Sequence, residues 1–147
     1  MSQLFILQKY CLPAVALLLS KFNHFAEIAR RNFETNGYDE KISLIEGSAS
    51  DVIPALPPEF KFDLAFIDGH KEAYADYVRL LSTRLQPGGI IVVDDALFHG
   101  DVLNQEATTD KGRGVTDLLA LVTDMSDWSR ILLPISNGIL LLQKPKQ

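Results

Sequence analysis

The chain has 147 residues, a length that predicts a single domain built around one hydrophobic core. Hydrophobic residues make up 47% of it and charged residues 22%, which are values of a folded globular protein and exclude a disordered or fibrous chain. The formal net charge is −5 and the basic residues are scattered, so we expect no nucleic acid partner.

The most apolar part of the chain is residues 4–22. Its unbroken apolar stretch, residues 14–19, is far shorter than the roughly 20 residues that span a bilayer, so we expect no membrane partner. Cys11 is the only cysteine, which excludes an intrachain disulfide and fits a cytoplasmic location. We expect Cys11 to be a small buried hydrophobic residue.

Helices and strands alternate in the middle of the chain. Apolar residues at helical spacing predict a helix over residues 24–36, which Gly37 ends. A β-rich run follows at residues 41–47, and a serine cap with a later proline break predicts a short helix within residues 48–60. Residues 62–69 are the next predicted strand.

The following helix is predicted within residues 71–89, whose terminal Pro-Gly-Gly predicts a turn. The next strand is predicted within residues 90–97, where the apolar run 90–93 precedes two aspartates. This strand and the one before it lack polar alternation, so both are expected to be buried on two faces, as in a parallel sheet covered by helices. The alternation of strands and helices predicts a doubly wound α/β fold.

The C-terminal third begins with a polar, glycine-bearing stretch at residues 99–114, which predicts a loop. Residues 115–125 predict a helix. Two strands at residues 129–135 and 139–145 are separated by the turn Ser-Asn-Gly, so an antiparallel hairpin is expected at the end of the chain.

Three carboxylates follow two neighbouring predicted strands. Asp68 ends the first strand, and Asp94 and Asp95 end the second. Because the carboxyl ends of parallel strands meet at one rim, where ligands bind, these oxygens outline a site for a hard cation such as Mg²⁺. Each aspartate alone could instead cap the next helix or loop, but three on adjacent strands favour the metal site. Lys71 either points back into the same cleft or is a solvated surface lysine.

Small residues follow the strand at residues 41–47 and should reach the same rim. Gly47 would let a ligand approach the backbone, and Ser48 and Ala49 are small enough to border a flat ring. Alone this is a weak signal, because many turns from a strand to a helix have such a composition.

The chain resembles the cation-dependent class I O-methyltransferases of the caffeoyl-CoA and catechol type. The likeness runs from about His24 to Lys144, and its most specific block is FDLAFIDGHKEAYADYVRLLSTRLQPGGIIVVDDALFHGDV. The resemblance implies a Rossmann-like, doubly wound, mostly parallel sheet that ends in an antiparallel hairpin. It also implies transfer of a methyl group from S-adenosylmethionine to a phenolic or catechol hydroxyl of a small molecule.

Carried over to this sequence, the resemblance makes Asp68, Asp94 and Asp95 the ligands of a divalent metal and Lys71 the general base. A divalent ion that binds two adjacent hydroxyls lowers the pKa of one of them, and the lysine would take its proton. The family commonly has Asp-Asn where this chain has two aspartates, so the site here is one negative charge richer.

The resemblance also implies a cofactor-binding set. Ala49 would lie at the adenine-binding turn together with Gly47 and Ser48. His70 falls where the family usually has an aspartate near the cofactor. This substitution changes both the charge and the hydrogen-bond donors beside S-adenosylmethionine.

The N-terminal region departs from the family pattern. Family members carry, ahead of the helix that corresponds to residues 24–36, a strand with an E-x-G-x-x-x-G turn and a second strand that ends in an acid for the ribose. The first glycine here is Gly37, and the ribose acid would fall near Ser20. Residues 1–147 are therefore expected to form one partial methyltransferase domain that lacks part of its N-terminal half. Its first 22 residues would supply a helix or one replacement strand, residues 15–20.

Two functions from different classes remain open. The first is a metal-dependent O-methyltransferase; the second is a noncatalytic remnant or interaction module of the same fold that has lost the glycine turn. Metal-assisted phosphate chemistry is disfavoured because no G-x-x-x-x-G-K-[ST] loop is present. Missing strands would expose a sheet edge and apolar helix faces, so we predict a homo-oligomer.

Overall fold

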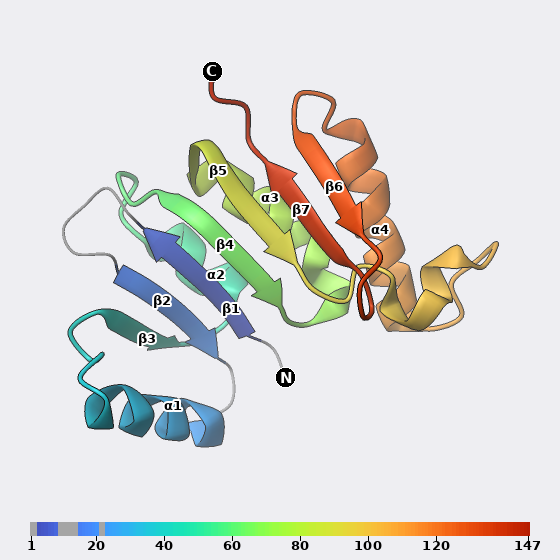
Figure 1. Ribbon diagram of the computed structural model, residues 1–147. Coiled ribbons are helices and arrows are strands. Elements are labelled where there is room, and N and C mark those ends of the chain that lie inside the picture. Colours follow the sequence, from blue (N-terminus) through green and yellow to red (C-terminus); the bar gives the residue numbers. More distant parts are fainter. Residues whose placement is uncertain (1–2, 9–14, 21–22) are drawn as a thin grey trace.

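The computed structural model describes residues 3–8, 15–20 and 23–147, and the side chains from Ala26 onward. Cys11, for which we predict a buried position, lies outside these residues. The described strands form one seven-stranded sheet in the order β3-β2-β1-β4-β5-β7-β6 (Figure 1). The strands are β1 (Gln3–Gln8), β2 (Val15–Ser20), β3 (Ile42–Glu46), β4 (Phe62–Asp68), β5 (Leu85–Val93), β6 (Ser129–Leu133) and β7 (Ile139–Gln143). The α-helices are α1 (Asn23–Thr35), α2 (Ala49–Ala55), α3 (Tyr74–Arg84) and α4 (Asp110–Asp124), and the 3-10 helices are η1 (Lys71–Ala73) and η2 (Phe98–Leu103).

Most strands of the sheet point the same way. The pairs β2/β3 and β4/β5 are parallel, while β1 is antiparallel to both β2 and β4. At the other end β7 is antiparallel to β5 and to β6. The predicted Rossmann-like sheet with a C-terminal antiparallel hairpin is therefore confirmed, and β1 adds a second reversal that the sequence did not predict.

The N-terminal segment supplies two strands, so the prediction of a helix or one replacement strand is wrong in number. β2 is the predicted strand, and it pairs with β3. β1 fills the position between β2 and β4, where Gln3 pairs with Ser20 on one side and with Asp68 on the other. The amino end of β1 therefore reaches the rim at which β2 and β4 present their carboxyl ends.

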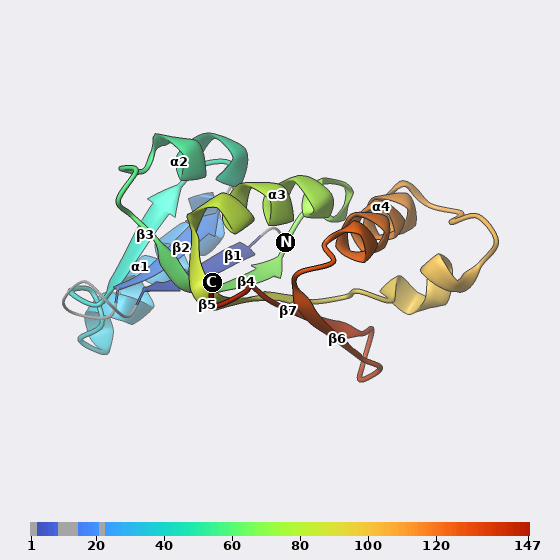
Figure 2. The ribbon, with the colours of Figure 1, turned by 90° about the horizontal axis from the view of Figure 1, so that it is seen from above.

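The helices lie unevenly on the two faces of the sheet. α2, α3 and α4 cover one face, whereas α1 lies on the other side, near β3 (Figure 2). The core fills the space between the sheet and the first group of helices. It includes fully buried side chains of three strands and two helices: Ile67, Ile91, Val93, Leu142, Val78, Leu81, Val115 and Leu118.

The predicted Pro-Gly-Gly turn is part of β5 in the structure. The pairing of β5 with β4 jumps there, from Leu85 opposite Phe62 to Ile90 opposite Leu64. Gly88 has a φ of 77°, a conformation that glycine adopts without strain. The chain is already extended at Leu85, directly after α3. The Pro-Gly-Gly residues therefore lie inside the strand, where they produce an irregularity in its pairing.

α4 begins earlier than predicted, at Asp110, so the predicted loop at residues 99–114 is too long. The Thr109 hydroxyl caps this helix by accepting a hydrogen bond from the Gly112 amide at 2.9 Å. In the part of the chain that the structure describes, no helix combines the length and the apolar character needed to cross a membrane.

Candidate active site

The predicted rim exists in the structure. Asp68 is the last residue of β4, and Asp94 and Asp95 directly follow β5, the parallel neighbour of β4. The Asp94 amide donates to the Ile67 carbonyl at 2.9 Å, which continues the pairing of the two strands to their ends. The parallel register therefore brings the three carboxylates to one edge of the sheet.

The three carboxylates form a compact cluster. Asp68, Asp94 and Asp95 each offer an oxygen, and these atoms lie within 4.8 Å of one another. All three residues are partly buried. Burial raises the pKa of Asp68, the nearby Lys71 opposes that effect, and the charges of the two neighbouring aspartates add to it. The negative charge of the three carboxylates is therefore larger than the positive charge that Lys71 supplies.

Lys71 lies against the acidic cluster and is not a solvated surface lysine, since only 9% of it is exposed. Its Nζ lies 2.7 Å from Asp95 Oδ2 and 3.9 Å from Asp68 Oδ1. Burial lowers the pKa of Lys71, but the hydrogen bond to Asp95 and the contact with Tyr74 outweigh it, so the pKa is raised. In this state Lys71 is the protonated partner of the carboxylates.

Tyr74 is a part of the site that the sequence analysis missed. Its hydroxyl accepts a hydrogen bond from Lys71 Nζ at 3.2 Å and one from the Gly69 amide at 3.3 Å. The Lys71 ammonium also lies 5.3 Å from the centre of the Tyr74 ring. The sequence feature that could have indicated this contact is the spacing of three residues between Lys71 and Tyr74 at the start of a helix. Tyr74 also falls on an apolar stripe of the predicted helix, and its full burial agrees with a core position.

Asn137 is the second residue that the sequence analysis missed. It lies in the turn between β6 and β7, and its side chain lies near enough to the Asp95 carboxylate to lower the pKa of that group. Burial raises the pKa of Asp95, but the hydrogen bond from Lys71 and the nearby Asn137 side chain outweigh this, so the pKa is lowered. No local pattern links residues 95 and 137, because only the sheet brings them together.

The turn of the C-terminal hairpin is fixed to the loop that carries Asp95. The Ala96 amide donates to the Gly138 carbonyl at 2.9 Å, and the Leu97 amide donates to the Asn137 carbonyl at 2.7 Å. A side chain at Gly138 would collide with Leu97, so the close contact requires glycine. Asp95 itself has a φ of 56°, which short polar side chains tolerate better than others. The hairpin therefore holds Asp95 in an uncommon backbone conformation.

Lys71 is positioned by α4. Gly114 lies on the buried side of this helix, where any side chain would collide with the backbone of Lys71 and Glu72. This glycine lets α4 pack directly on η1. The lysine backbone is thereby fixed between the end of β4 and α4.

The predicted cofactor residues lie on the same rim in two separate places, after β3 and after β4. Gly47 and Ser48 follow β3, and Ala49 is the buried first residue of α2. His70 follows β4, and its Nδ1 lies 3.3 Å from Glu72 Oε2. β2 and β1 lie between β3 and β4 in the sheet, so they separate Gly47, Ser48 and Ala49 from His70.

The rim fits a divalent cation better than it fits S-adenosylmethionine. Three partly buried carboxylates with one ammonium leave a net negative charge, and hard oxygen donors suit Mg²⁺. The cofactor side is less complete. Between β2 and β4 the rim presents the amino end of β1, so no turn from a strand to a helix lies there.

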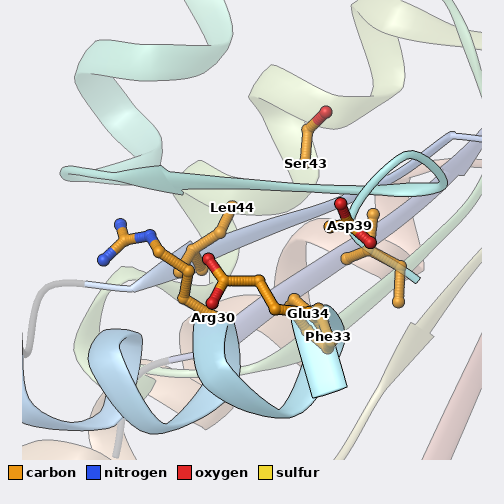
Figure 3. Close-up of a pocket in the computed structure, with 7 residues that line it drawn as sticks. Arg30, Phe33, Glu34, Asp39, Ser43 and Leu44 are labelled. Carbon is orange, nitrogen blue, oxygen red and sulfur yellow. The ribbon is translucent and has the colours of Figure 1, made fainter. Parts of the chain in front are cut away.

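A separate pocket of about 280 Å³ lies between α1 and β3. Arg30, Phe33 and Glu34 reach it from the helix, and Asp39 comes from the connection to the strand (Figure 3). None of its lining residues belongs to the predicted site. Arg30 is also engaged elsewhere, in an ion pair with Glu46 at 2.7 Å.

Comparison with known proteins places this fold and rim in a family. A catechol O-methyltransferase of Niastella koreensis is 29% identical over 99 residues, which cover 66% of this chain and 45% of the relative. Caffeoyl-CoA O-methyltransferase 2 of Zea mays is 31% identical, covering 93% of this chain and 59% of the relative. The SAH-bound Podospora anserina methyltransferase PaMTH1 superposes with a TM-score of 0.75 at 25% identity, over 90% of this chain and 60% of that structure.

The chain thus spans about half the length of the curated relatives that it matches. Residues 16–145, nearly the whole chain, match the sequence profile of the O-methyltransferase family. This match includes the rim carboxylates, Lys71 and the C-terminal hairpin. The chain belongs to the O-methyltransferase family.

Proposed function

We propose that this chain acts as a divalent-cation-dependent O-methyltransferase that uses S-adenosylmethionine and a catechol-like or phenolic hydroxyl. The observation that carries the proposal is the cluster of Asp68, Asp94 and Asp95, whose oxygens lie within 4.8 Å of one another with Lys71 against them. Relatives named catechol and caffeoyl-CoA O-methyltransferases support the substrate class.

In this proposal Asp68, Asp94 and Asp95 hold the cation, with Mg²⁺ as the first candidate. A bound divalent cation lowers the pKa of a coordinated hydroxyl. Lys71 accepts the proton of that hydroxyl at Nζ. Because the hydrogen bond to Asp95 keeps the lysine protonated, Lys71 would first have to release its own proton to solvent, which becomes easier once Asp95 turns its oxygens away from the lysine. Tyr74 then keeps the amine in place through its hydroxyl.

The residues proposed for the cofactor are Gly47, Ser48, Ala49 and His70. Ala49 and its neighbours would border the adenine, and His70 would lie near the cofactor with Glu72 as its partner. No glycine precedes Gly37 in the sequence, so no glycine turn follows β1 or β2.

A noncatalytic role is the second candidate, and one observation favours it. β1 runs in reverse between β2 and β4, so the rim position between them carries a strand's amino end and no backbone turn for the methionine moiety. Such a chain would keep the cation site and lose the methyl donor.

The deciding experiment is calorimetric titration of the full chain with Mg²⁺, and then with S-adenosylmethionine in the presence of Mg²⁺. We expect Mg²⁺ binding that the substitution Asp68→Asn weakens by about tenfold or more. Lys71→Ala is the matched control, since it removes a positive charge from the same cluster and should not weaken binding of the cation.

Micromolar binding of S-adenosylmethionine supports the enzyme. Bound Mg²⁺ without any cofactor binding at millimolar concentration supports the noncatalytic role. Equal Mg²⁺ affinity in the wild type and in Asp68→Asn would overturn the metal site itself.

A further inference from the structure

Asp101 lies at the centre of a hydrogen-bond cluster that the proposed function does not use. Its Oδ1 accepts hydrogen bonds from the Thr108 amide at 2.9 Å and from the Thr108 hydroxyl at 2.8 Å. Its Oδ2 accepts one from the Thr109 amide at 3.2 Å and one from the Thr109 hydroxyl at 2.8 Å. We call these four hydrogen bonds the Asp101 clamp. They tie η2, which contains Asp101, to the residue that caps α4.

Both carboxylate oxygens of the clamp are engaged, and the carboxylate is charged. The hydrogen bonds from Thr108 and Thr109 favour the charged form, so they hold the pKa of Asp101 far below its usual range. Hydrogen bonds to an ionised acceptor are stronger than those between neutral groups. The negative charge also lies at the amino end of α4, where the helix dipole favours it. Near neutral pH the clamp therefore joins the loop firmly to the helix.

Two buried glycines let the start of α4 pack against both 3-10 helices. A side chain at Gly112 would collide with the Asp101 carboxylate. A side chain at Gly114 would collide with the backbone of Lys71 and Glu72. Positions two residues apart lie on nearly opposite sides of an α-helix, because each turn contains 3.6 residues. The start of α4 is therefore held between η2 on one side and η1 on the other.

The two contacts of α4 lead back to the acidic cluster. η2 begins shortly after Asp95, and the Phe98 amide donates to the Asp95 carbonyl at 3.0 Å. η1 begins with Lys71, whose Nζ lies 2.7 Å from Asp95 Oδ2. A path of contacts therefore runs from Asp95 through η2, the Asp101 clamp and α4 to Lys71. The ion pair between Lys71 and Asp95 closes this path into a ring.

The clamp holds a part of α4 that the hydrophobic core does not hold. From Val115 onward the helix contributes buried apolar side chains to the core, whereas its first residues contribute none. The loop before α4 also has longer hydrogen bonds, which join Asn104 to Asp101 at 3.2 and 3.3 Å and Arg113 to the Ala107 carbonyl at 3.3 Å. Removal of the Asp101 carboxylate should therefore release the start of α4 and leave the rest of the helix packed.

We propose that Asp101 is a positioning residue. It holds the start of α4 against η2, and through Gly114 it keeps the backbone of Lys71 in place, which sets the position of the Lys71 ammonium beside the acidic cluster. The inference rests on the proposed function only in taking Lys71 as the base. The position of Lys71 itself can be measured in a chain that has no activity.

The rate at which Lys71 reacts with acetic anhydride tests the positioning role without substrate or cofactor. Peptide mass spectrometry of the full chain measures this rate for Lys71 and, in the same sample, for Lys144. Lys144 is the internal reference, because it is also partly buried and donates to the Ser82 and Leu85 carbonyls at 2.8 and 2.9 Å, at the sheet edge opposite the rim. A global loss of stability would raise both rates, whereas local release of Lys71 raises only its own.

We expect Asp101→Ala to raise the rate at Lys71 by about tenfold and to leave the rate at Lys144 unchanged. Asp101→Asn should raise the rate at Lys71 by only about threefold. The amide keeps an acceptor oxygen for Thr108, but it places a donor opposite the Thr109 amide, so half of the clamp is restored. If Asp101→Ala does not fold, the smaller rise in Asp101→Asn decides the question.

Asp110→Ala is the matched control. It removes another exposed carboxylate from the start of α4, whose ion pair with Arg113 is not part of the clamp, and it should leave both rates unchanged. Equal Lys71 rates in the wild type and the Asp101 variants would overturn the proposal. So would an equal rise in Asp110→Ala, or a rise at Lys71 that Lys144 follows to the same extent. These outcomes are independent of the cation site, which the Mg²⁺ titration tests separately.

Discussion

The sheet has two halves that reach the rim in different ways. In the half formed by β4, β5 and β7, two parallel strands end in aspartates, and a hairpin turn and α4 hold the residues around them. In the half formed by β1, β2 and β3, the strand next to β4 runs in reverse. The first half therefore concentrates side-chain chemistry at the rim, whereas in the second half the predicted cofactor residues that the structure describes are those of the short turn after β3.

This difference teaches that the metal-binding part of the rim and the cofactor-binding part depend on different features of the sheet. The metal rim requires only the ends of two neighbouring parallel strands, which this chain retains. A cofactor that lies across the sheet requires consecutive strand ends with turns between them, and one reversed strand interrupts that series.

The largest effect should come from the close packing of α4 beside the half of the sheet that carries the three aspartates, which we call the metal half. Gly114→Ala should lower the free energy of unfolding by about 3 kcal/mol, because the new methyl group would collide with backbone that cannot move aside easily. Urea unfolding measures the change. Thr123→Ala, at an exposed position of the same helix, should change it by less than about 0.5 kcal/mol. Equal stability of the two variants would show that α4 is not tightly docked on η1.

An intermediate effect should come from the contact between the hairpin turn and Asp95. Asn137→Ala should weaken the binding of Mn²⁺, used as a probe for the cation site, by about tenfold, since partners of ligands orient them. The control is Asn104→Ala, which removes a hydrogen bond from an asparagine to an aspartate, Asp101, away from the rim. Equal Mn²⁺ affinity in both variants would refute the positioning role of Asn137.

The smallest effect should come from the ion pair that joins α1 to β3 in the other half. The side chains of Arg30 and Glu46 are 48% and 41% exposed, so their coupling should be about 0.5 kcal/mol or less. A double-mutant cycle of Arg30→Ala and Glu46→Ala, followed by thermal unfolding, measures it. A coupling well above about 1 kcal/mol would mean that this half is tied together as firmly as the metal half.

Much of the fold followed from local patterns. The helix at residues 24–36 and the strands around residues 41–47, 62–69 and 129–145 were expected from periodicity and turn residues, and the structure contains them. The site aspartates were visible because each ends an apolar run, where burial of a lone carboxylate would be costly. The burial of Lys71 could not be read in the same way, since a lysine after a strand is usually solvated.

By itself the sequence determined the order of the elements, the three aspartates at strand ends and the likeness to a methyltransferase. Only the tertiary structure decided that β1 runs in reverse, that Asn137 meets Asp95 and that the helices lie unevenly on the two faces of the sheet. The physical reason is that a short apolar strand has the same pattern in either direction. Its direction follows from the connection, and the few residues between Gln8 and Val15 cannot form the crossover that parallel neighbours require.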